Sequence, residues 1–133
     1  MDRVMRKGFI VVALALLLAP LPAAAAEFPF EQELFLDVKP LPGSKRVPML
    51  EITRDGRAII DLWCRSGEGS VKIEDDMIEL TLGAMREEGC TPERTQRDEA
   101  MAEALAKVAN WRMEDDVLVL IGPTELRYTL SSH

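Results

Sequence analysis

The feature that most constrains the fold of this chain is a series of short runs in which apolar and polar residues alternate. In one of them, Ile78, Leu80 and Leu82 would share one face, with Glu79 and Thr81 on the other. This pattern is typical of half-buried strands in an antiparallel sheet. The predicted strands are Leu34–Lys39, Met49–Thr53, Arg57–Trp63, Ser70–Glu74, Met77–Leu82, Val117–Ile121 and Glu125–Leu130, with a further short strand beginning at Trp111 and Met113.

Turn signals separate these runs. The strongest is Asp55-Gly56, because a type I′ hairpin turn needs positive φ at both central residues and favours Asp-Gly. The other signals are Pro40 to Gly43, Asp75-Asp76, Asp115-Asp116 and Gly122-Pro123. Several neighbouring strands are therefore expected to form hairpins.

One segment has the pattern of a helix. Thr91 offers an N-cap, Pro92 suits the first helical position, and Glu93 lies where the helix dipole favours an acid. The apolar residues that follow recur at helical spacing: Met101, Ala104, Leu105 and Val108. We expect one helix from about Pro92 to Asn110. The order of elements then predicts an α+β fold, an antiparallel, curved β-sheet packed around a single amphipathic helix.

The first 26 residues have the pattern of a secretory signal peptide. Arg3, Arg6 and Lys7 form a basic start, Phe9 to Ala19 form a short apolar run, and small residues suitable for cleavage occupy 23–26. We expect cleavage close to Ala26. This would leave residues 27–133 as a single domain in the periplasm or secreted from the cell.

An uncleaved membrane anchor is the alternative. Against it, Pro20 and Pro22 break an apolar run that is shorter than the about 20 residues of a membrane-spanning helix. Loss of residues 1–26 would change the formal net charge from −7 to −9, because one acidic and three basic residues are removed. Such a charge disfavours binding to nucleic acid or to anionic membrane surfaces.

Cys64 and Cys90 are the only cysteines of the chain. Export would place this pair in an oxidising compartment, which favours one disulfide, and two reduced buried thiols are the alternative. A disulfide closing this loop would contribute on the order of 3.5 kcal/mol in the chain-entropy model. The chain has no C-x-x-C motif, and His133 is its one histidine, so neither a redox motif nor a zinc ligand set is indicated.

Several short motifs together resemble the META domain (HslJ-like) family of bacterial envelope proteins. They cover nearly all of residues 33–130 and comprise Asp55-Gly56-Arg57, Trp63-Cys64-Arg65, Gly67 with Gly69, Gly89-Cys90-Thr91-Pro92, Val117-Leu118-Val119-Leu120 and Leu126-Arg127-Tyr128. Trp63 and Arg65 depart from the pattern, since the family typically has Gly and Asn around the first cysteine. The resemblance implies an antiparallel sheet curved around one helix, export to the envelope and an association with stress responses. It implies no catalytic residues.

Other chemistry finds little support in the residues. Asp75-Asp76 and Asp115-Asp116 could attract calcium, but adjacent acids in hairpin turns are usually solvated and no EF-hand loop surrounds them. Ser66 has no candidate base except His133, and no Gly-rich phosphate loop indicates a nucleotide cofactor. A glycosidase-type carboxylate pair lacks an indicated pocket. We therefore assign no catalytic, metal or cofactor residues, and a hydrolytic enzyme is the third choice.

The first functional hypothesis is an exported, non-enzymatic envelope protein, acting through protein interaction or as a stress-associated accessory. The alternative is a periplasmic module that binds a small apolar ligand between the sheet and the helix. Met101 and Trp111 would line that site, although their spacing fits core packing better. The partner is accordingly either an envelope protein or a small apolar molecule.

Overall fold

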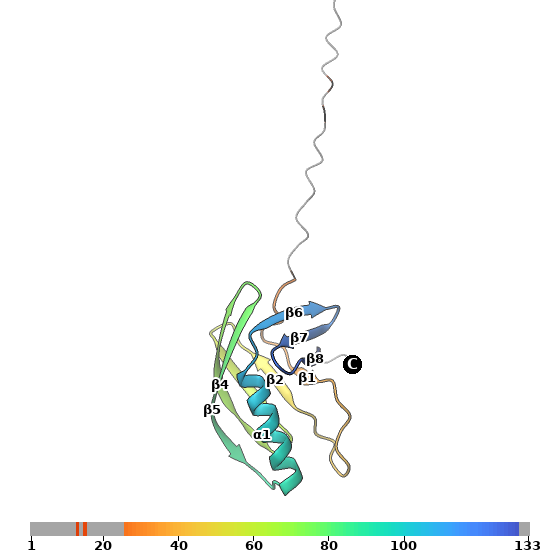
Figure 1. Cartoon of the computed structure of the whole chain (residues 1–133), viewed down its shortest axis with the longest axis vertical. Coiled ribbons are helices and arrows are strands. Elements are labelled where there is room, and N and C mark those ends of the chain that lie inside the picture. Colours follow the sequence, from red (N-terminus) through yellow and green to blue (C-terminus); the bar gives the residue numbers. More distant parts are fainter. Residues whose placement is uncertain (1–12, 14, 16–25, 131–133) are drawn as a thin grey trace, which may run out of the picture.

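The structure is a computed structural model that describes Ala13, Ala15 and residues 26–130. Nearly all of the predicted signal peptide, residues 1–26, and the C-terminal residues 131–133 lie outside the described part. Within that part, no helix is long and apolar enough to cross a membrane. The elements follow one another as β1 (Leu34–Leu36), β2 (Met49–Ile52), β3 (Arg57–Asp61), β4 (Arg65–Glu74), β5 (Met77–Glu87), α1 (Pro92–Ala106), β6 (Asn110–Glu114), β7 (Val117–Ile121) and β8 (Leu126–Leu130) (Figure 1).

The strands form a closed antiparallel barrel. Each strand pairs with its neighbours along the chain, and β8 pairs back with β1, with Leu34 opposite Leu130 and Leu36 opposite Tyr128. The prediction of a curved sheet packed around a helix is therefore wrong. The sheet closes on itself, and the closing contact joins the two ends of the domain, which no local pattern encodes.

Strand side chains fill the barrel. Leu50, Ile60, Leu118, Leu120 and Tyr128 are each at most 1% exposed and belong to one core cluster. Alternation along the strands produces this core, because every second side chain of a strand points to the same face. The core is thus formed by the inner face of the barrel, and the helix supplements it.

The helix and the N-terminal segment lie toward opposite ends of the barrel (Figure 1). From α1, Met101 and Leu105 enter the core. At the other end, the ring of Phe28 is 8% exposed and meets Trp111 edge-on, with 5.1 Å between ring centroids. The residues just after the predicted cleavage position are therefore part of the folded domain.

The hairpin between β2 and β3 forms at the predicted Asp-Gly, but with a different turn. Gly56 alone has positive φ, +86°, whereas a type I′ turn needs it at Asp55 as well. The amide of Gly56 donates to the carbonyl of Thr53 at 3.2 Å, and the amide of Thr53 donates to Arg57 at 2.9 Å. In this longer loop, glycine occupies the one position whose backbone is in the left-handed region.

The hairpin β4–β5 is longer than predicted because glycines permit a close approach of its two strands. A Cβ at Gly69 would lie 2.4 Å from the carbonyl oxygen of Thr81, and one at Gly83 would lie 2.5 Å from that of Glu68. The pairing register shifts between Gly67 and Gly69. Such a bulge bends the hairpin and increases its twist, which helps a sheet to close.

The helix begins as predicted but ends earlier. Thr91 is the N-cap, its side chain accepting from the amide of Arg94 at 3.3 Å, and Pro92 is the first helical residue. The helix stops at Ala106 rather than near Asn110, because Asn110 already pairs with Ile121 in the sheet. The pairing of β5 with β6 is limited to Met77 opposite Asn110, so this seam is the narrowest of the barrel.

Candidate functional site

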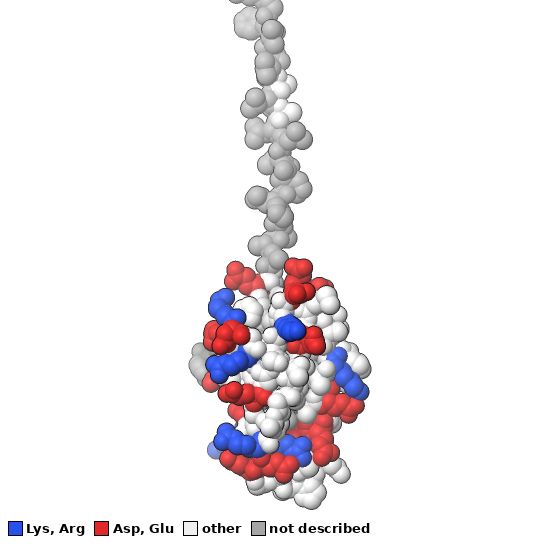
Figure 2. Space-filling model, turned by 90° about the vertical axis from the view of Figure 1, so that its left-hand side faces the viewer, with Lys and Arg blue, Asp and Glu red and all other residues white. Residues whose placement is uncertain are grey.

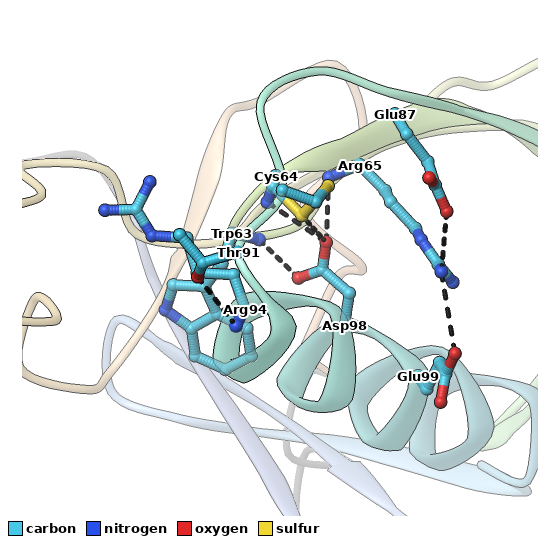
Figure 3. Close-up of a disulfide and its surroundings, with 9 residues drawn as sticks. Trp63, Cys64, Arg65, Glu87, Thr91, Arg94, Asp98 and Glu99 are labelled. Carbon is cyan, nitrogen blue, oxygen red and sulfur yellow. Dashed lines mark hydrogen bonds and ion pairs between the residues drawn. A yellow bond between two sulfur atoms is a disulfide. The ribbon is translucent and has the colours of Figure 1, made fainter.

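A disulfide joins Cys64, just before β4, to Cys90, just before α1 (Figure 3). Their Cα atoms lie 5.5 Å apart, within the ordinary range for a disulfide. The disulfide prediction is confirmed, and the alternative of two reduced thiols is excluded. The bond ties the helix to the connection between β3 and β4.

Asp98 of α1 holds the same connection by hydrogen bonds. Its carboxylate is 0% exposed and accepts from the backbone amides of Trp63 at 2.8 Å, Cys64 at 3.0 Å and Arg65 at 2.8 Å (Figure 3). Three converging N–H groups compensate the burial of the carboxylate. This carboxylate fixes the backbone from which the Trp63 side chain projects.

Sequence reasoning gave Asp98 no role, although one signal was present. Asp98, Met101 and Leu105 recur at i, i+3 and i+7 and are the buried residues of α1. A charged residue on the apolar stripe of a helix needs polar partners in the interior. That position could have identified Asp98 as a buried acceptor, but its partners lie on another element and could not be read from the pattern.

The disulfide and Asp98 are in direct contact. Cys64 Sγ lies 3.0 Å from Asp98 Oδ2, and a disulfide sulfur carries no proton to donate there. Cys64, Cys90 and Asp98 would match a metal-ligand set by residue type, since their ligand atoms all lie within 4.8 Å of one another. In the disulfide, however, neither sulfur is the thiolate that binds metals.

Cys64, Cys90 and Asp98 form what we call the disulfide corner, and Arg65 links this corner to β5 and makes a further contact with α1. Its Nη2 lies 2.7 Å from a carboxylate oxygen of Glu87 on β5 and 3.6 Å from one of Glu99 on α1. Figure 3 shows the guanidinium between these two carboxylates and away from Asp98. The corner therefore joins β4, β5 and α1 through one disulfide, one buried carboxylate and these ion pairs.

A groove lies beside the corner. Its volume is about 280 Å³, and it is lined by Trp63, Arg97, Ala100, Met101, Ala104, Thr124 and Leu126. The guanidinium of Arg97 lies over the Trp63 ring, 5.9 Å from its centroid. A second hollow of about 260 Å³ shares Ala100, Ala104 and Thr124 with the first, so the depression continues along α1 toward Lys107. We call this continuous depression the helix groove.

Met101, one of the two residues predicted to line a ligand site, lies in the helix groove but is only 5% exposed and packs mainly in the core. Trp111, the other, lies in a separate groove of about 570 Å³ with Ala26, Glu27, Asp75, Asp76, Arg112 and Met113. Its indole Nε1 donates to the carbonyl of Asp75 at 2.8 Å. The structure therefore does not bring Met101 and Trp111 together in one pocket.

The outer face of β6, β7 and β8 carries a charge network. Val119 is 0% exposed although it faces outward, opposite Arg112 on one side and Arg127 on the other. Glu114 lies 2.7 Å from Arg112 and 2.8 Å from Arg127, and hydrogen bonds from these arginines lower the pKa of Glu114. On the face shown in Figure 2, acidic and basic side chains are likewise interspersed.

Two solved structures share the fold of this chain. No curated protein matches it. Among solved structures, an NMR structure of a protein from Burkholderia xenovorans is 18% identical over 86% of this chain and 97% of that one, with a TM-score of 0.62. A second NMR structure is 19% identical over 74% and 88% of the two chains, with a TM-score of 0.57. At these identities the likeness shows a shared fold.

A DUF4847 family protein from Bacteroides vulgatus is 17% identical over 62% of this chain, with a TM-score of 0.49, and the chain spans 57% of that protein's length. The family model of the META domain matches residues 32–132, which is most of the chain. This match includes residues 33–130, the stretch over which the sequence motifs lie. The chain therefore belongs to the META domain family.

Proposed function

We propose that this protein is exported, loses residues 1–26, and acts in the envelope as a non-enzymatic, stress-associated accessory that binds another protein. The signal-like pattern of the first 26 residues supports export. The Cys64–Cys90 disulfide supports it too, because disulfides persist in oxidising compartments. Membership of the META domain family fits the same location.

The helix groove is the observation that carries the binding proposal. Trp63 and Arg97 are of the residue types that dominate binding energy at protein interfaces. The backbone of each residue is held in place: the amide of Trp63 donates to the Asp98 carboxylate, and Arg97 lies within α1. A rigid aromatic anchor loses little entropy on binding, which favours recognition.

The two buried polar side chains of the described part have structural partners, which is consistent with the non-enzymatic part of the proposal. Asp98 and Thr53 are the buried polar residues of the described part. Asp98 is occupied by three backbone amides, and the Thr53 hydroxyl contacts Asp55 and Arg57 in a turn. Both side chains hold the backbone of the fold. Saturable, mutation-sensitive turnover of any substrate would contradict this part of the proposal.

Export is tested by the mass of the protein from the periplasmic or secreted fraction, purified without reductant. The expected mass is that of residues 27–133 less two hydrogens, and reduction followed by alkylation should then add two alkyl groups. A full-length mass in the membrane fraction would instead favour the anchor.

Binding through the helix groove is tested by a photo-crosslinking amino acid placed at Ala104. We expect a discrete adduct in cells that Trp63→Ala abolishes. The same amino acid at Lys39, exposed and outside the groove, is the matched control. Equal adducts at both positions, or an adduct at Ala104 that survives Trp63→Ala, would contradict binding at this surface.

A small apolar ligand is the second candidate, and the groove at Trp111 favours it. This groove is larger than the helix groove, and Trp111 and Met113 contribute apolar surface to it. Native mass spectrometry of the exported protein would show a ligand as extra mass that is lost on activation. Such mass, absent in Trp111→Ala but retained in Trp63→Ala, would favour this candidate over the first.

A further inference from the structure

The two sulfurs of the disulfide lie in opposite surroundings. Cys64 is 3% exposed, and its sulfur contacts the buried Asp98 carboxylate at 3.0 Å. Cys90 is partly exposed and immediately precedes Thr91, the N-cap of α1. The positive end of the helix dipole therefore lies near Cys90, and a negative charge lies against Cys64. Figure 3 shows the Asp98 carboxylate beside Cys64.

These surroundings bear on thiol–disulfide exchange. An incoming thiolate bonds to one sulfur, the S–S bond breaks, and its electron pair leaves on the other sulfur as a thiolate. The reaction is faster when the leaving thiolate is stabilised. Cys90 is the more exposed of the two cysteines, so attack is expected at its sulfur, and the thiolate expelled is then that of Cys64, against a carboxylate. The favourable leaving group, Cys90, would require attack on the buried sulfur.

We propose that Asp98 protects the Cys64–Cys90 disulfide from small thiols by making Cys64 a poor leaving group. Attack on the more exposed Cys90 expels Cys64, which is the poorer leaving group. Attack on Cys64 would expel the better leaving group, Cys90, but Cys64 is buried. Neither direction of attack is therefore favourable. When Cys90 is attacked, the thiolate that leaves on Cys64 lies against the Asp98 carboxylate and is destabilised by it, which slows cleavage of the S–S bond. The reverse step, in which the Cys64 thiolate attacks the Cys90 sulfur and expels the small thiol, restores the disulfide. Asp98 acts here as a positioning residue that sets the charge around Cys64.

The first experiment locates the attack. Native protein is treated with reduced glutathione, trapped with N-ethylmaleimide, and mapped by peptide mass spectrometry. We expect the rare trapped intermediate to carry glutathione on Cys90 and the maleimide on Cys64. Glutathione on Cys64 would overturn the proposal, because attack would then occur at the buried sulfur.

The second experiment isolates the charge of Asp98. The rate of reduction by glutathione is compared between Asp98→Asn and Leu105→Ala, a destabilising core variant that leaves the carboxylate in place. Urea is adjusted so that both variants have the same free energy of unfolding. We expect Asp98→Asn to react at least about tenfold faster, because its leaving thiolate no longer faces a charge. Equal rates at matched stability would overturn the proposal.

A smaller substitution covers the case in which Asp98→Asn does not fold. Asp98→Ser also removes the charge and leaves space for water, and it is compared with Leu105→Ala in the same way. If neither variant folds, the trapped intermediate of the wild-type protein decides. Glutathione on Cys90 and maleimide on Cys64 support the proposal, and glutathione on Cys64 overturns it.

Discussion

At the scale of single residues, Asp98 makes the largest set of buried polar contacts described above. One carboxylate satisfies three amides of a tight connection and touches the disulfide that fixes the same connection. Its removal would leave three amides in a buried corner without an acceptor, and each unsatisfied group costs about 1–3 kcal/mol. The disulfide alone does not supply an acceptor for them.

We therefore expect Asp98→Ala to lower the free energy of unfolding by about 3 kcal/mol or more. Urea denaturation with the disulfide intact measures the change. Gln96→Ala, an exposed position on the same helix, serves as control and should change stability by less than about 0.5 kcal/mol. A loss below about 1 kcal/mol for Asp98→Ala would show that water replaces the carboxylate.

Tyr128 is the second residue with a testable consequence. Burial in the barrel raises the pKa of its phenol above the ordinary value. A group whose pKa is raised in the folded state contributes stability below its unfolded pKa, about 10, and loses that contribution as the pH rises further. Folding stability should therefore fall above about pH 10.

Tyr128 is the one tyrosine of the chain, so the absorbance near 295 nm that is present in the wild type and missing in Tyr128→Phe, which retains both tryptophans, reports its phenolate. We expect its ionisation to coincide with alkaline unfolding monitored by circular dichroism, and Tyr128→Phe to weaken the pH dependence above about pH 10. Ionisation that precedes unfolding, with native circular dichroism retained, would contradict the prediction.

At the scale of elements, the β4–β5 hairpin depends on glycine for steric reasons. A Cβ at Gly69 would meet the carbonyl oxygen and carbon of Thr81 and the Cα of Leu82, all backbone atoms that cannot move independently of the strand. We expect Gly69→Ala to destabilise the protein by about 2 kcal/mol or more.

The matched control is Ser70→Ala, an exposed neighbour on the same strand, which should be close to neutral. Thermal denaturation of both variants makes the comparison. Equal melting temperatures would mean that the two strands can separate locally without loss of stability, and that the close approach at Gly69 is not required.

The disulfide is the second feature at this scale, because it joins the start of α1 to the connection before β4. We expect Cys64→Ser and Cys90→Ser each to lower the free energy of unfolding by about 2–4 kcal/mol, since the unfolded chain regains the entropy of an open loop. Urea denaturation without reductant measures this. Unchanged midpoints in both variants would remove the disulfide as a source of stability.

At the scale of the whole molecule, the barrel has seams of unequal strength. The β1–β8 seam pairs three residues on each strand, whereas the β5–β6 seam pairs Met77 with Asn110 alone. The helix connects β5 to β6 and packs beside β5, so side-chain packing substitutes for part of the missing ladder. Local opening should therefore begin at the β5–β6 seam.

Native-state hydrogen exchange tests this expectation. Amides at the β5–β6 seam, such as those of Ile78 and Trp111, should exchange faster than the amide of Asp37, which donates to the carbonyl of Arg127 at the end of the β1–β8 seam. Tyr128→Ala, which removes a large core side chain from β8, should reduce protection at the β1–β8 seam as well. Uniform protection at both seams would indicate that the barrel opens only as a whole.

The sequence predicted the local elements well. The strand Val117–Ile121 has the predicted bounds, the helix begins at Pro92 after its Thr91 cap, and the disulfide pairs the two cysteines. The bend in β4–β5 was missed because Gly67, Gly69 and Gly83 weaken the strand pattern. Glycines disfavour a strand statistically, yet here they permit the close approach that the strand needs.

By itself, the sequence determined the alternating faces, the positions of the turns and the helix cap, because these depend on neighbours within a few residues. It also indicated the disulfide through the parity of its cysteines. The tertiary structure alone decided that the sheet closes through β1 and β8, that Asp98 serves the backbone of another element, and that Met101 and Trp111 lie in separate grooves. Each of these depends on contacts between distant segments, whose partners follow from how the whole core packs.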